Sequence, residues 1–78
     1  MIERETRIEL FTVLRSLAEI VPEMRAGQIM AALGELCADM HGRGLWEAED
    51  AELLETMWKF RHDLEALSAT ANGQLNAS

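Results

Sequence analysis

The sequence predicts an all-α fold, a three-helix bundle that we expect to dimerise and to end in a disordered C-terminal tail. Apolar residues recur at helical spacing in three segments, and no segment alternates with the period of two that a half-buried strand shows. Pro22 separates the first two segments, and Gly42 and Gly44 separate the last two. We therefore predict helices at residues 2–20, 22–41 and 47–69. They form a single helical domain at residues 1–70, followed by a flexible tail at 71–78.

The first predicted helix has an apolar face that is wider than one neighbouring helix needs. Its centre consists of Leu10, Phe11, Leu14, Leu17, Ala18 and Val21. Val13 and Ile20 extend this face sideways, and Ile2 lies roughly in line with them. Pro22 disfavours helical angles at the residue before it, so the helix should stop near Ile20. Because proline is tolerated in the first turn of a helix, the second helix should begin at once and lie beside the first.

The second predicted helix sorts into three strips when each residue turns the helix by about 100°. An apolar strip comprises Ala26, Ile29, Met30, Leu33, Leu36, Cys37 and Met40. A neighbouring strip contains only small residues, Gly27, Ala31, Gly34 and Ala38, and the third strip is polar. The two non-polar strips indicate that this helix packs against two neighbours. Gly42 is well placed to end it as a left-handed C-terminal cap.

The third predicted helix begins with acidic residues and continues with apolar residues at helical spacing. The acidic residues are Glu47, Glu49, Asp50 and Glu52, which suit the positive end of the helix dipole. The apolar residues are Leu53, Leu54, Met57, Phe60, Leu64 and Leu67. We expect Trp46 to pack back on the first turns, and Trp58 lies on the flank of the apolar stripe. After Leu67 the composition is too polar to hold the chain in place, which predicts the flexible tail.

Composition restricts the class of protein. The 78 residues include one cysteine, Cys37, so no internal disulfide can form. With no cleavable signal sequence and no apolar run near the ~20 residues that cross a bilayer, we expect a soluble cytoplasmic protein. The net charge of −7 argues against a nucleic acid or an anionic membrane as partner, because both are bound through Lys and Arg.

Two segments resemble a family of short bacterial proteins of uncharacterised function. That family has a Pro-x-x-Arg-x-Gly-Gln segment followed by a Trp-Asp-x-Glu-Asp-x-Glu-Leu-Leu segment. The first is similar to residues 22–28 here and the second to residues 46–54, with Glu47 where the family tends to have Asp. The resemblance covers about half of the chain. It implies the same helical layout and implies no activity.

Cys37 and His41 are the residues with the best spacing for metal chemistry. They are four positions apart on a helix, so both side chains could reach one ion. A structural zinc site needs four ligands, however, and the other histidine, His62, lies on the polar side of the third helix. We predict that Cys37 is a small buried hydrophobic residue and that His41 ends the helix. A small metal- or thiol-dependent sensor using Cys37 and His41 is the alternative.

We expect no enzyme, and no catalytic, cofactor-binding or metal-binding residue. Catalytic carboxylate pairs need a cleft that shifts their pKa values, and a three-helix chain of this length has little room for one. A polar contact is expected instead, because Asp50 falls near the apolar angle of the third helix while Arg25 and Gln28 lie beside the core of the second. Since buried polar groups need partners, we predict that these three residues link the two helix starts. A recognition site formed by the same residues is the alternative.

The remaining apolar surface predicts interaction with another protein. It consists of Ile2, Val13, Ile20, Gly27, Ala31, Gly34, Ala38 and Trp58. A chain this small buries only ~60% of its surface on folding, and contiguous exposed apolar patches mark binding surfaces. The sequence therefore predicts a non-enzymatic interaction module or accessory subunit. Its partner is a second copy of itself, as a homodimer, or an unknown protein.

Overall fold

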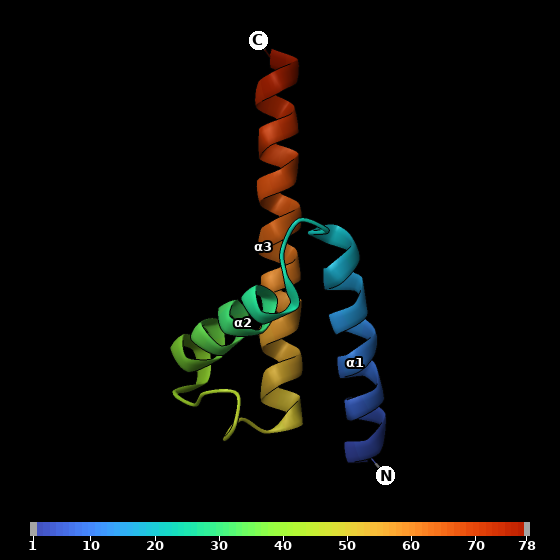
Figure 1. The fold of residues 1–78 in the computed structure, drawn as a ribbon, viewed down its shortest axis with the longest axis vertical. Helices are drawn as coiled ribbons and strands as arrows, with labels where there is room; N and C mark the ends of the chain where they lie inside the picture. The colour runs from blue at the N-terminus through green and yellow to red at the C-terminus, as the bar shows by residue number, and fades with distance from the viewer. Residues whose placement is uncertain (1, 78) are drawn as a thin grey trace.

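The computed structural model describes the backbone of residues 2–77 and the side chains of residues 4–67. The described chain forms three α-helices and no strand: α1 (Ile2–Ile20), α2 (Ala26–His41) and α3 (Asp50–Ala77). The predicted all-α, three-helix fold is thereby confirmed (Figure 1).

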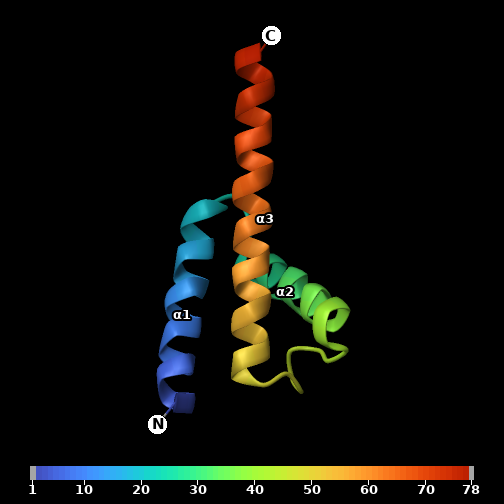
Figure 2. The ribbon, with the colours of Figure 1, turned by 180° about the vertical axis from the view of Figure 1, so that it is seen from behind.

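The central helix is α3, because both other helices pack against it. Helix α1 lies alongside α3 and runs in the same direction, while α2 crosses α3 obliquely (Figures 1 and 2). Two contacts fix the parallel register: Arg7 Nε donates to Asp50 Oδ2 at 3.0 Å, and Arg61 Nη1 donates to Ser16 Oγ at 3.4 Å. Helices α1 and α2 barely touch each other. The expectation that the second helix has two neighbours, with the first beside it, was therefore wrong.

Helix α2 begins at Ala26, four residues later than predicted. Arg25 has an extended backbone (φ −77°, ψ 155°) and precedes the first helical residue. Its N–H donates to Gln28 Oε1 at 2.8 Å, and its carbonyl accepts from Ile29 N–H at 3.0 Å. These bonds make Arg25 the N-cap residue, a position that Ser, Thr, Asp and Asn usually occupy. Arginine gives no capping signal, so the sequence did not indicate this start.

Helix α2 ends at His41 as predicted, and Gly42 caps it. Gly42 has left-handed backbone angles (φ 73°, ψ 16°) and donates its N–H to the carbonyl of Ala38 at 2.9 Å. Glycine takes these angles without the steric penalty that a Cβ would bring.

Helix α3 begins at Asp50, three residues after the predicted start. A turn precedes it, in which the carbonyl of Gly44 accepts from the N–H groups of residues 47 and 48. Glu49 then donates its N–H to Glu52 Oε1 at 3.0 Å, the same arrangement that starts α2. The turn leaves the side chain of Trp46 96% exposed, so the prediction that Trp46 packs on the first turns was wrong.

The core contains side chains from all three helices. Its buried apolar residues are Leu10, Val13, Leu17, Val21, Ile29, Leu33, Cys37 and Met57. Leu33 and Met57, which belong to the apolar strips predicted for the second and third helices, are completely buried; this confirms that those strips face the core. Thr56 is also completely buried and was not predicted there; its hydroxyl donates to the carbonyl of Glu52 at 2.9 Å. This bond satisfies the hydroxyl within α3 and makes burial of a threonine acceptable.

Helix α1 presents a different part of its apolar arc to α3 than predicted. Val13, expected at the edge, is 3% exposed, and Ile20 packs partly buried against the core. Phe11, expected in the core, is 60% exposed, and Ala18 is exposed as well. Arg7 explains the rotation, because it shares a helical strip with Phe11 and Ala18. Turning that strip onto α3 would bury an arginine guanidinium at large cost.

The C-terminal part of α3 extends beyond the rest of the bundle (Figures 1 and 2). The helix continues to Ala77, past the predicted end at residue 69 and through most of the predicted tail at 71–78. The register of α1 with α3 places Ile20 level with Glu65, so α1 does not reach the part of α3 above that point. A helical segment without a packing partner depends on intrinsic propensity alone. The flexibility of residues 71–78 stays a prediction, and their side chains lie outside the described residues.

We predict that Leu33→Ala lowers the free energy of unfolding by about 2–5 kcal/mol, because it leaves a cavity at a fully buried site. Leu67→Ala makes the same chemical change on α3 at a side chain that is 68% exposed, and should change stability by less than about 0.5 kcal/mol. Urea unfolding of both variants measures the difference. Equal effects of the two substitutions would contradict the core assignment.

Deleting residues 71–78 should leave the midpoint of urea unfolding unchanged, because that part of α3 packs against no other helix. The mean residue ellipticity at 222 nm should stay constant or rise if the deleted segment is frayed in solution. A clear fall in the unfolding midpoint would show that the segment folds back on the bundle, contrary to this structure.

Candidate protein-interaction surface

The predicted polar link between the starts of the second and third helices does not form. Asp50 instead pairs with Arg7 of α1 at 3.0 Å, and Gln28 accepts the backbone N–H of Arg25. The side chain of Arg25 is exposed and has no carboxylate within ion-pairing distance among the described residues. The prediction was wrong because Gln28 Oε1 accepts a backbone N–H at the start of its own helix, and the carboxylate of Asp50 pairs with α1.

His41 joins the end of α2 to α3 through two carboxylates. Its side chain is 17% exposed; Nδ1 lies 4.0 Å from Glu52 Oε2 and Nε2 lies 3.3 Å from Glu55 Oε2. Arg43 Nη1 approaches the other oxygen of Glu52 at 3.8 Å. The two ring nitrogens of an imidazole point away from each other, so these carboxylates do not converge on one point. The cluster is suited to holding the end of α2 on α3.

Cys37 and His41 have the placements predicted for them. Cys37 is a free thiol with no exposed surface, and His41 ends α2. Within the part of the chain whose side chains are described, no three His, Cys, Asp or Glu side chains are arranged to hold a metal ion. The sensor alternative that uses Cys37 and His41 stays a prediction.

The predicted interface residues lie in different environments. Val13 is buried in the core and Ile20 half-buried against it, so neither forms the apolar edge that we expected. The side chain of Ile2 lies outside the described residues. Trp58 is 44% exposed on the flank of α3, where Arg61 stacks over its ring at 5.4 Å from the centroid.

The strip of small residues on α2 is largely uncovered within the monomer. Gly27, Ala31 and Ala38 are exposed, whereas Gly34 is half-buried. Leu45, from the connection between α2 and α3, lies over Gly34, and a Cβ added there would come 3.3 Å from Leu45 Cγ. Part of the strip of small residues is thus covered by this chain itself. The role of the other three residues in an interface stays a prediction.

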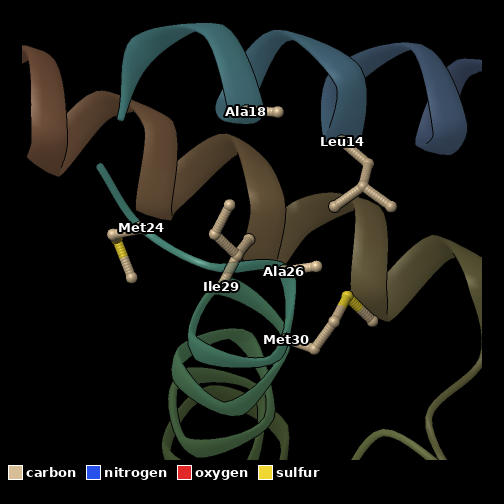
Figure 3. A pocket seen from close by; sticks show the side chains of 6 residues that line it. All are labelled: Leu14, Ala18, Met24, Ala26, Ile29 and Met30. Atoms are coloured by element: carbon tan, nitrogen blue, oxygen red, sulfur yellow. The ribbon is translucent and has the colours of Figure 1, made fainter. Parts of the chain in front are cut away.

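An apolar groove opens between α1 and α2, and the sequence did not indicate it. Its lining consists of Leu14, Ala18, Met24, Ala26, Ile29 and Met30, which we call the α1–α2 groove. Figure 3 shows the side chains of Leu14 and Met30 approaching each other from the two helices. The cavity volume is about 200 Å³. This is below the usual range of small-molecule sites, about 300–1,000 Å³, and suits a single side chain of a protein partner.

Exposed apolar residues of α1 continue the groove along the helix. Phe11 precedes Leu14 by three positions and Ala18 by seven, so the three share one strip. Ile8, three positions before Phe11, is 59% exposed. Ile8 and Phe11 thus add exposed apolar side chains to the helix that forms one wall of the groove, and exposed apolar surface is a feature of protein interaction sites.

No family model, curated protein sequence or solved structure matches this chain. Among the described residues, no helix combines the length and the apolar character that a membrane crossing requires.

Lys59 and Asp63 form an ion pair on the surface of α3, and this pair affects the pKa of the Asp63 carboxyl. Lys59 Nζ donates to Asp63 Oδ1 at 2.9 Å, and this bond, together with the nearby charges of Lys59 and His62, lowers the pKa of the Asp63 carboxyl. A carboxyl whose pKa is lower in the folded state adds stability above its unfolded-state pKa. That stability is lost as the pH falls through the folded-state pKa.

We predict that Lys59→Met returns the pKa of Asp63 toward its ordinary value, whereas Lys59→Arg keeps it low. NMR titration of the Asp63 side chain between about pH 2 and 6 measures both variants. An unchanged titration in Lys59→Met would show that the ion pair does not persist in solution.

Proposed function

We propose that the protein is a non-enzymatic protein–protein interaction module that associates through the α1–α2 groove, with a second copy of itself as partner. The observation that carries this proposal is the groove itself. It is lined by apolar side chains of α1, of α2 and of the connection between them. Phe11 is exposed on the strip of α1 that contributes Leu14 and Ala18 to the lining.

The energetic reason is the incomplete packing of α1. One part of its apolar arc packs on α3, and Leu14 and Ala18, on the other part, line the groove without filling it. Burial of apolar surface contributes roughly 25 cal/mol per Å², so association through this surface would be favourable. A twofold-symmetric dimer is the commonest closed assembly of identical chains. The resemblance to short bacterial proteins noted above is compatible with this role but contributes no activity.

Ala18→Glu tests the proposal, because it places a carboxylate on the wall of the groove at an exposed position. We expect sedimentation equilibrium at micromolar to submillimolar concentrations to show a dimer for the unmodified chain. Ala18→Glu should raise the dissociation constant at least about tenfold, equivalent to about 1.4 kcal/mol.

Thr12→Glu is the matched control, because it introduces the same charge at an exposed position of α1 on another side of the helix. It should leave the dissociation constant within about twofold, and both variants should retain their circular dichroism spectra. A single-chain mass for the unmodified protein across this concentration range would contradict self-association. Equal effects of the two substitutions would contradict the groove as the contact.

A further inference from the structure

We propose that the α1–α2 groove receives Trp46 of a second copy of this chain. This inference rests on the proposed function, because it names the segment that fills the groove. In a twofold-symmetric pair each copy would offer one Trp46 and one groove, so the contact would be made twice.

Trp46 is almost fully exposed, as expected of an interface residue whose binding pocket is empty. Its side chain is 96% exposed, more than any other large apolar side chain among the described residues. The turn at Gly44 holds it outward, since the carbonyl of Gly44 accepts two successive backbone N–H groups just after Trp46. Tryptophan is enriched among the residues that dominate binding energy in interfaces, typically as a rigid side chain in a central pocket.

The groove matches this side chain in size and character. Its volume of about 200 Å³ accommodates one large aromatic side chain, and its lining is apolar. Two methionines, Met24 and Met30, contribute to that lining, and the flexible thioether adapts well to an aromatic ring. No other aromatic side chain among the described residues has comparable exposure, since Phe11 is 60% exposed and Trp58 44%.

The segment that carries much of the groove is nearly neutral, so it does not strongly repel the acidic segment around Trp46. Residues 46–55 carry five acidic and no basic side chains, so a negative surface would repel this segment. Residues 1–25 carry five acidic and four basic side chains and are nearly neutral. Arg15 and Arg25 adjoin groove residues in the sequence, as do Glu19 and Glu23, so these charges balance. The carboxylates of Glu47 and Glu49 flank Trp46. Arg15 contacts Glu19 only at 3.7 Å with both side chains mostly exposed, so it can turn toward a docking carboxylate.

The experiment uses the full chain with Trp58→Phe, which leaves Trp46 as the only tryptophan. Phenylalanine keeps an aromatic ring beside Arg61. We expect Trp46 emission to be that of a solvent-exposed indole at low concentration. Emission should shift to shorter wavelength over the same concentration range in which sedimentation shows the mass doubling.

Two variants of the Trp58→Phe chain test Trp46 and the α1–α2 groove independently. Trp46→Ala should raise the dissociation constant at least about 30-fold, and Ala18→Glu should raise it at least about tenfold while leaving Trp46 in water. An equimolar mixture of the two should partly restore dimer and blue-shifted emission. In the mixture, Trp46 of the Ala18→Glu chain meets the intact groove of the Trp46→Ala chain. Thr12→Glu mixed with Trp46→Ala serves as the control for an intact groove on both chains.

The outcomes distinguish this inference from the proposed function. If the chain dimerises and Ala18→Glu weakens the dimer, but Trp46→Ala does not and Trp46 emission stays that of exposed indole, the inference is overturned and the proposed function stands. If the chain stays monomeric, self-association fails altogether. If the mass grows beyond a dimer, the reciprocal closed pair is overturned.

Discussion

The arrangement of the described helices depends on one constraint: α1 and α2 both pack against α3 and hardly against each other. Helices α1 and α2 lie on different sides of α3. In a closed three-helix bundle each helix would cover the others, and the apolar arcs would all be buried. Here the flanks of α1 and α2 that face each other remain apolar and open, which produces the α1–α2 groove. The groove is therefore a consequence of the packing scheme and requires no further element.

Polar contacts on both flanks of α1 set its rotation against α3. Arg7 pairs with Asp50 on one flank, and Ser16 accepts from Arg61 on the other, with Val13 between them in the core. Each contact is partly exposed and stabilises the fold by little. Together they disfavour the alternative rotation, because that rotation would move a guanidinium into the contact. Apolar burial thus supplies the stability, and the charged groups select one of two comparable apolar faces.

The sequence allowed the fold class, the end of α2 and the core positions of Leu33 and Met57 to be predicted, because each follows from local periodicity or a single glycine. The rotation of α1 could not be predicted from periodicity, since its apolar arc is wide enough for two orientations. The position of Arg7 favours the observed orientation of α1 over the other, because the other would bury its guanidinium. The starts of α2 and α3 were missed because Gln28 and Glu52 reach back to backbones of residues that rarely cap helices. The groove is a tertiary feature that joins residues of both helices.

The most direct test of this account measures which side of α1 is covered. A soluble paramagnetic agent broadens NMR signals of exposed methyl and aromatic groups, and the measurement is made at concentrations where the chain is monomeric. The account predicts strong broadening for Phe11 and Ala18 and protection for Val13 and Leu17. Protection of Phe11 with strong broadening of Val13 would contradict the account. It would mean that α1 turns its other face to α3, and that the α1–α2 groove does not exist in solution.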